Sequence, residues 1–138
     1  MYAKIVNLFS NISIETPMLR TGHGQSFLIT IGEDVILYDT GADSESLLGN
    51  MEVLSVSPDR ITKLVLSHGH LDHTGGLPGF LDKRNTNQTL PLIAHPDFGE
   101  TKIYRVLSFF KKSISCPELS EKQKNKLDIH LTREPEQI

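Results

Sequence analysis

The sequence is poor in cysteine, in net charge and in long apolar stretches, and each scarcity argues against a class of protein. A single cysteine, Cys116, rules out an internal disulfide, so we expect a reducing compartment and a cytoplasmic protein. The net charge of −3 and the isoelectric point near 6.0 give no electrostatic reason to expect a nucleic acid or an anionic membrane as partner. No apolar run approaches the roughly 20 residues that a membrane helix needs, and the opening MYAKIVNLFS lacks the features of a signal peptide.

The composition that remains fits one folded domain. A chain of 138 residues is large enough for a single hydrophobic core, so we expect one domain over residues 1–138. Hydrophobic residues make up 38% and charged residues 22%, as in ordinary globular proteins. The sequence contains no internal repeat, low-complexity tract or linker that would divide it.

The first half of the chain alternates strand and helix patterns. AKIVNLF predicts a strand, and SFLITIG and EDVILYDTG predict two more, joined by the Gly-Glu-Asp turn of a hairpin. A helix is predicted after Ser44 as its N-cap, with Leu47, Leu48, Met51 and Leu54 at helical spacing. KLVLSH then has the short apolar run of a buried strand.

The second half continues the alternation. A short helix is predicted through Leu77, Phe80 and Leu81, and TLPLIAHPD predicts another buried strand. TKIYRVLSFF is compatible with a strand or a helix, LSEKQKNKL with a polar surface helix, and DIHLTRE with a final strand. Strands that alternate with helices predict the α/β fold class.

The stretch LSHGHLDHTGG, residues 66–76, holds three of the six histidines and an aspartate within six positions. At the end of a strand, side chains two residues apart point the same way, so His68 and His70 can converge on one point. Gly69 between them removes bulk and tolerates an unusual backbone angle. Asp72 and His73 follow where the chain turns, and they can face a second point close by.

Two interpretations of this stretch compete. Imidazole nitrogens and carboxylate oxygens hold zinc at about 2.0–2.2 Å, and two metal points about 3.5–4 Å apart would form a dinuclear hydrolytic centre. The alternative is a histidine-rich surface turn without a ligand. Three histidines and an aspartate directly after a buried strand favour the metal site.

Several motifs together resemble one protein family. HGHLDH, of the form HxHxDH, resembles the signature of the metallo-β-lactamase superfamily, and VILYDTG resembles its earlier motif, a strand that ends in an aspartate, here Asp39, with a glycine after it. One branch, which includes the dihydropterin-forming synthase of methanopterin biosynthesis and many metal-dependent hydrolases, is similar over nearly the whole chain. The similar stretches are GHGQSFLITIGEDVILYDTGADSESLLGN, LSHGHLDHTGGL, PLIAHPDF and LDIHLTREPEQI.

The resemblance implies a fold and a set of site residues. The fold is a metallo-β-lactamase-like αββα sandwich, of which this chain corresponds to the N-terminal half: one mixed sheet with helices on one face. His68 and His70 match ligands of a first metal, and Asp72 and His73 match ligands of a second. Asp39 matches an aspartate that orients the ligands without touching metal, a role that sets ligand direction and basicity.

The remaining histidines and the cysteine have weaker signals. His95 follows the next buried strand, where the branch has a similar HPD, and it either faces the substrate or closes the strand with a backbone hydrogen bond. His23, in GHGQS, is either close to the substrate or an ordinary loop residue. His130 is interpreted as a side chain on the polar face of the last strand, and Cys116 has no basic neighbour in sequence to mark it as a nucleophile.

The sequence also departs from the family pattern. Superfamily members add a histidine, a bridging aspartate and another histidine after this point. Here the later candidates, among them Asp97 and Asp128, stand in no matching motif. The first metal thus has two protein ligands of three and the second has two of four, whereas an open catalytic zinc site keeps three.

The same departure affects packing and function. A half sandwich has an apolar inner sheet face, so we expect a homodimer, a complementary second-half chain or rearranged C-terminal elements to cover it.

One expected function is a metal-dependent hydrolase whose metal-bound hydroxide, oriented by Asp72, attacks an ester, amide or phosphoester bond of a small-molecule substrate. The metal would be one or two ions of Zn, or alternatively Fe, Mn or Ni. The other is a non-catalytic half-domain that needs a partner chain to complete its metal site.

Overall fold

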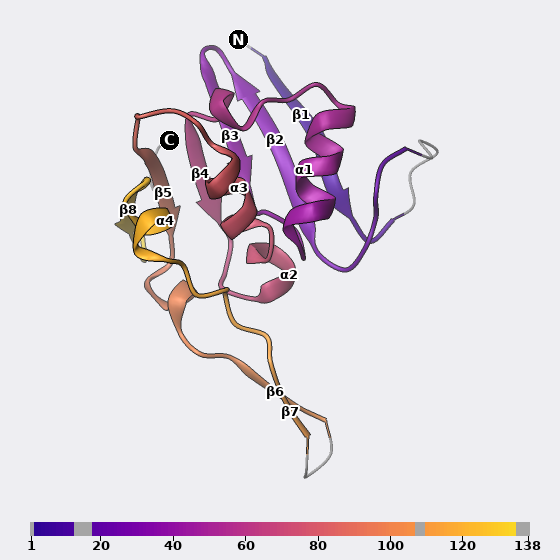
Figure 1. The fold of residues 1–138 in the computed structure, drawn as a ribbon, viewed down its shortest axis with the longest axis vertical. Coiled ribbons are helices and arrows are strands. Elements are labelled where there is room, and N and C mark those ends of the chain that lie inside the picture. Colours follow the sequence, from indigo (N-terminus) through magenta and orange to yellow (C-terminus); the bar gives the residue numbers. More distant parts are fainter. Residues whose placement is uncertain (1, 13–17, 107–109, 135–138) are drawn as a thin grey trace.

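A six-stranded mixed sheet forms the centre of the protein (Figure 1). The structure is a computed structural model that describes residues 2–12, 18–106 and 110–134. β1, β2 and β3 are antiparallel neighbours, whereas β3, β4, β5 and β8 run parallel, so the carboxyl ends of the parallel strands meet at one edge. The strands follow the order β1 (Ala3–Ser10), β2 (Gln25–Ile31), β3 (Asp34–Tyr38), β4 (Lys63–Leu66), β5 (Leu90–Ala94) and β8 (Leu127–Leu131).

Short helices connect the parallel strands and lie over one face of the sheet. Figure 1 shows α1, α3 and α4 in front of the strands. A separate hairpin extends away from the sheet and consists of β6 (Ile103–Val106) and β7 (Phe110–Ser113). The helices are α1 (Ser44–Val53), α2 (Leu71–Thr74), α3 (Leu77–Lys83) and α4 (Glu121–Lys124), with the short turns η1 (Pro58–Arg60) and η2 (Pro96–Gly99).

The hydrophobic core lies between the helices and the sheet. Alternate residues of β4 and β5, such as Leu64 and Leu92, are fully buried in one cluster with Leu47 of α1 and Phe80 of α3. Alternation with period two is what one buried face of a sheet requires. The α/β fold class with one mixed sheet is therefore confirmed.

The opposite face of the sheet carries apolar side chains that are only half-buried. Strand register places Phe27, Tyr38, Val65 and Ile93 side by side across β2, β3, β4 and β5, and Ile29 lies in the next row. All five side chains are of intermediate exposure in the described part of the chain. We call these five residues the open sheet face.

Most predicted elements are confirmed, with one difference in the N-cap of α1 and one ambiguous stretch that is now resolved. Ser44 is not the N-cap of α1: Asp43 has the extended backbone of a cap, and its carboxylate accepts from Ser46 N at 2.7 Å. Ser44 is the first helical residue, and its Oγ instead accepts from Gly79 N at the start of α3. The ambiguous TKIYRVLSFF forms β6 and the start of β7, and its residues 107–109 lie outside the described residues.

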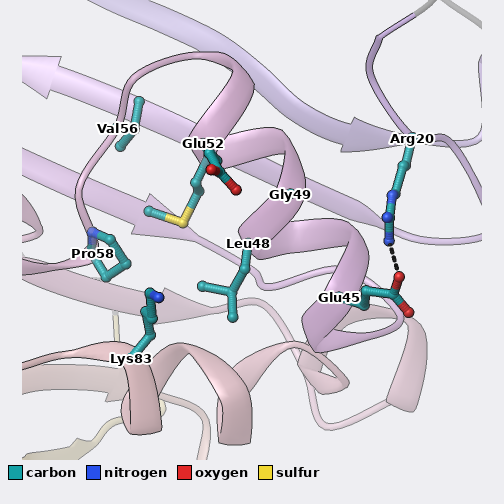
Figure 2. A pocket seen from close by; sticks show the side chains of 9 residues that line it. Arg20, Glu45, Leu48, Gly49, Glu52, Val56, Pro58 and Lys83 are labelled. Atoms are coloured by element: carbon teal, nitrogen blue, oxygen red, sulfur yellow. Dashed lines mark ion pairs between the residues drawn. The ribbon is translucent and has the colours of Figure 1, made fainter.

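A hollow of about 550 Å³ lies on the outer side of the helix layer (Figure 2). It is lined by Leu48 of α1 and Lys83 of α3, and the exposed pair Arg20–Glu45, 2.7 Å apart, closes one side. No predicted site residue lines it. None of the helices in the described ranges has the length and apolar character to cross a membrane.

Candidate metal centre

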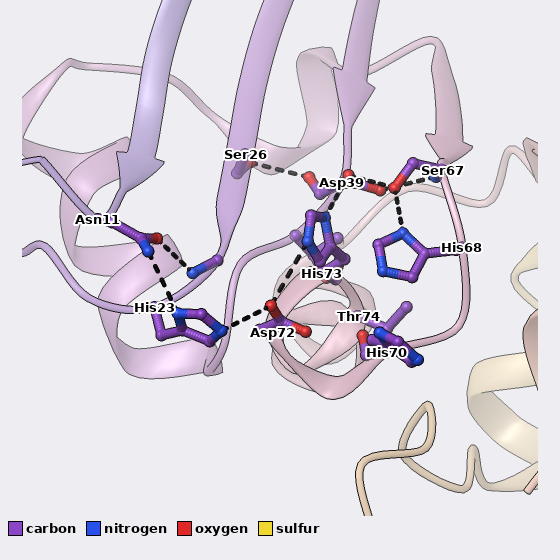
Figure 3. A network of polar contacts seen from close by, with 12 residues as sticks. Asn11, His23, Ser26, Asp39, Ser67, His68, His70, Asp72, His73 and Thr74 are labelled. Atoms are coloured by element: carbon purple, nitrogen blue, oxygen red, sulfur yellow. Dashed lines mark hydrogen bonds and ion pairs between the residues drawn. The ribbon is translucent and has the colours of Figure 1, made fainter. Parts of the chain in front are cut away.

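The HGHLDH stretch lies at the carboxyl ends of two neighbouring parallel strands. Asp39 follows β3, and Ser67 and His68 follow β4, so all three meet at one edge of the sheet. The chain then turns into α2, whose first turn carries Asp72 and His73. Figure 3 shows these side chains pointing toward one another.

A glycine allows the tight turn between β4 and α2. A Cβ on Gly69 would lie 1.8 Å from the carbonyl oxygen of Phe98 in η2, so only glycine fits. The close approach packs the turn against η2 and fixes the directions of the flanking His68 and His70.

Three of the four predicted ligands form one group. One ligand atom from each of His68, Asp72 and His73 lies within 4.8 Å of the others. The His68 ring is 4.2 Å from the His73 ring and 4.6 Å from the His70 ring, centroid to centroid. Helix α2 starts directly after His70, and its first turn brings Asp72 and His73 beside His68. The assignment of two ligands to each of two metal points stays a prediction.

Asp39 is fully buried behind this group and organises it. Its carboxylate accepts from Ser67 N at 2.8 Å, from Ser67 Oγ at 2.7 Å and from His73 Nδ1 at 2.8 Å. Its φ of 56° lies in the left-handed region, which aspartate tolerates better than most residues.

The Asp39 contacts determine the protonation of both imidazoles. A carboxylate only accepts, so neutral His73 carries its proton on Nδ1 and leaves Nε2 with a lone pair. Ser67 Oγ uses its single proton on Asp39, so at 2.8 Å it accepts from His68 Nδ1. In the neutral form, His68 Nε2 is therefore also unprotonated, and both histidines have an Nε2 lone pair, which a metal ligand requires.

Two further features fit a cation at this group. Asp72 Oδ2 and His73 Nε2 lie 3.5 Å apart, and two acceptors at this distance repel unless a positive species lies between them. Burial lowers the pKa of His68 below its ordinary value, and the neighbouring His73 and His70 lower it further. The lowered pKa favours the neutral imidazole of His68, the form that binds metal.

The family model described as the metallo-beta-lactamase superfamily matches residues 19–134. The match spans most of the chain and contains every residue of the group described above. The chain belongs to the metallo-beta-lactamase superfamily.

Curated superfamily relatives match over part of their length. A 7,8-dihydropterin-6-methyl-4-(beta-D-ribofuranosyl)-aminobenzene-5'-phosphate synthase of Methanocaldococcus jannaschii is 42% identical over 79 residues, which cover 54% of this chain and 26% of the synthase. A ribonuclease Z of Pyrococcus furiosus is 32% identical over 95 residues, which cover 67% of this chain and 29% of that enzyme. The chain thus spans less than a third of the length of these relatives.

Solved metallo-beta-lactamase folds match in the same partial way. The Rm3 metallo-beta-lactamase has a TM-score of 0.56 and 24% identity, with 83% of this chain and 40% of that chain covered. Human tRNase Z, short form, has a TM-score of 0.52 and 19% identity, with 69% and 36% covered. These matches confirm the fold and leave the substrate open.

The other predicted site residues lie at different places around the superfamily motif. The imidazole of His23 reaches Asp72, with Nε2 3.3 Å from Oδ2. His95 caps η2, where its Nδ1 accepts from Asp97 N at 3.2 Å, and a role near the substrate stays a prediction. The exposed His130 pairs with Asp128 at 3.1 Å.

Sequence reasoning missed Ser67, the hydroxyl that links Asp39 to His68. The available signal was its position after β4, next to the end of β3 in a parallel pair. Cys116, in contrast, agrees with its interpretation: it is partly buried, and burial raises the pKa of its thiol, which disfavours the reactive thiolate.

A pocket of about 390 Å³ opens beside the metal-motif residues His70 and Asp72. Tyr104 and Lys112, directly opposite each other in the β6–β7 hairpin, line its far side. The hairpin is held there because Leu71 N donates to Ile114 O at 2.8 Å. No pattern in the sequence predicted that Tyr104 and Lys112 line this pocket, because the hairpin reaches the site only through tertiary packing.

Proposed function

We propose that this protein is a metal-dependent hydrolase of the metallo-beta-lactamase type, acting on an ester, amide or phosphoester bond of a small molecule. The observation that carries the proposal is the Asp39 network, which leaves Nε2 of both His68 and His73 free to bind metal beside the Asp72 carboxylate. Superfamily membership adds support, since its members include hydrolases such as ribonuclease Z.

The roles proposed for the residues follow from their chemistry. His68, His73 and Asp72 would hold the cation, with His70 beside them, and Asp72 would also orient the attacking water. A bound divalent cation would supply an activated water near neutral pH and would polarise the scissile bond. Nitrogen and carboxylate donors suit Zn²⁺, and Fe, Mn or Ni are the alternatives. The pocket between α2 and the β6–β7 hairpin would receive the substrate.

A second candidate function is supported by the number of donors and by the open sheet face. The group within 4.8 Å has three protein donors in the described residues, enough for one open zinc site but not for two metals. The chain would then be a subunit or half-domain whose metal site is completed by a partner that also covers the open sheet face.

The experiment that tests the proposal is metal analysis of protein purified without chelator. We expect about one or two equivalents of zinc or iron per chain to survive desalting, and the double variant His68→Ala, His70→Ala to retain none. His130→Ala, on the exposed part of β8, is the matched control and should keep the metal. If the wild-type protein retained no metal, the proposal that this chain alone forms a metal centre would be contradicted.

Hydrolysis assays then separate the two candidates. Turnover of a phosphodiester or β-lactam reporter substrate that requires the retained metal would support the hydrolase. Stable metal without turnover of any ester, amide or phosphoester reporter would favour the subunit that acts with a partner.

A further inference from the structure

A histidine from outside the HGHLDH stretch contacts the metal group. His23 precedes β2; its Nε2 lies 3.3 Å from Asp72 Oδ2, and its Nδ1 lies 3.2 Å from Asn11 Nδ2 (Figure 3). The backbone holds this loop in place: Gly24 has a φ of +123°, and a Cβ there would lie 1.9 Å from the carbonyl oxygen of Asp72. Because only glycine fits, backbone packing brings His23 to Asp72.

Asn11 determines which His23 nitrogen carries the proton. Gly24 N donates to Asn11 Oδ1 at 2.8 Å, and a backbone N–H can only donate, so the amide oxygen faces Gly24 and the amide NH₂ faces His23. The NH₂ group can only donate, so His23 Nδ1 accepts. Neutral His23 therefore carries its proton on Nε2, the nitrogen that faces Asp72.

We infer that His23 is a positioning residue that presents its Nε2–H to Asp72 and does not itself bind the metal. A protonated Nε2 has no lone pair for a cation, and His23 is not among the three residues that group within 4.8 Å. The N–H instead restrains the Asp72 carboxylate at Oδ2, the oxygen that also faces His73 Nε2. This role rests on the proposed metal centre, in which Asp72 is a ligand.

Zn²⁺ affinity, measured with the metal alone in a competition titration, tests the role. Orienting partners of metal ligands are worth about 10–100-fold in affinity, and we expect about tenfold for His23→Ala because this side chain is 81% exposed. His23→Gln, which keeps an N–H near the Nε2 position, should stay within about threefold of wild type, whereas His23→Asn should weaken binding as much as alanine does.

His130→Ala is the matched control, because His130 is also an exposed histidine paired with an aspartate, at 3.1 Å. It should leave Zn²⁺ affinity unchanged. Wild-type affinity in His23→Ala, or equal losses in His23→Gln and His23→Ala, would overturn the positioning role.

The tautomer of His23 is tested separately in metal-free protein by ¹⁵N–¹H correlation spectra of the imidazoles at pH 8. We expect the Nε2–H form in wild type and a mixture of both forms in Asn11→Ala. A wild-type His23 in the Nδ1–H form would overturn the inference even if Zn²⁺ binds. Protein that shows the Nε2–H form but binds no Zn²⁺ would overturn the proposed metal centre, and the positioning role with it.

Discussion

At the scale of single residues, Asp39 is the centre of the site although it is not a predicted ligand. Its buried carboxylate accepts hydrogen bonds from Ser67 N, Ser67 Oγ and His73 Nδ1. Because Ser67 Oγ also contacts His68 Nδ1, Asp39 sets the tautomer of His68 through Ser67. Asp39 has a left-handed backbone conformation, with a φ of 56°, at this position. Such strain commonly gathers at functional sites, where the surrounding structure maintains it.

We expect Asp39→Asn to fold but to bind metal about 10–100-fold more weakly. Asparagine tolerates the φ of 56°, but its NH₂ group cannot accept from Ser67 or His73. The free energy of unfolding should fall by about 1–3 kcal/mol, because a buried donor loses its acceptor. Zn²⁺ titration and urea unfolding measure both effects.

Asp128→Asn is the control for this prediction, because Asp128 also contacts a histidine but is exposed and lies on β8. It should change neither the Zn²⁺ affinity nor the stability measurably. If Asp39→Asn bound Zn²⁺ as tightly as wild type, Asp39 would have no orienting role.

At the scale of elements, the turn from β4 into α2 positions the histidines. The turn is tight because Gly69 lies against the backbone of η2, and α2 is anchored from the other side by Thr40 N, which donates to His73 O at 2.7 Å. A four-residue helix has little stability of its own. Its geometry therefore depends on these tertiary contacts.

We predict that Gly69→Ala lowers the free energy of unfolding by about 1–3 kcal/mol and weakens metal binding, because the added methyl would overlap the Phe98 carbonyl. Gly99→Ala, at the end of η2, is the matched control: its Cβ would meet nothing within 4 Å, so we expect a change of at most about 0.5 kcal/mol. Urea unfolding compares the two variants. Equal stability of both would show that the turn can relax around a side chain.

At the scale of the whole molecule, helices cover one face of the sheet and the open sheet face carries half-buried apolar side chains. Contiguous apolar patches beyond a few hundred Å² on a protein surface usually mark an interface. The sequence predicts three ways to cover this face: a second copy of the chain, a complementary second-half chain, or rearranged C-terminal elements. A two-fold pair is the commonest arrangement of identical subunits.

For the first occupant we expect light scattering at micromolar concentration to give the mass of a dimer. Val65→Lys, in the middle of the open sheet face, should convert it to a monomer, because burial of an unpaired ammonium is costly. Val53→Lys changes a 39% exposed valine on α1 and should leave the dimer intact. A monomeric wild-type protein would exclude the homodimer and leave the complementary second-half chain or rearranged C-terminal elements as the proposals.

Most secondary-structure elements and the position of the candidate site could be predicted from the order of the residues. Period-two and period-3.6 apolar patterns determined most of the strands and helices, because local side-chain direction follows backbone type. The spacing of HGHLDH after an apolar strand determined the position of the group proposed to hold a metal, since a strand end and one helical turn are short-range geometry. Side-chain capping was less certain: Asp43 and Ser44 are both good caps, and the packing of Ser44 against α3 decided between them.

Only the tertiary structure decided how distant residues cooperate. The pairing of β3 with β4 brought Asp39 to Ser67 and His73, the close approach of Gly24 brought His23 to Asp72, and the β6–β7 hairpin brought Lys112 to the pocket. These contacts join residues about thirty to fifty positions apart, and no periodicity encodes them. They follow from strand order and backbone packing, which depend on the whole chain burying one common core.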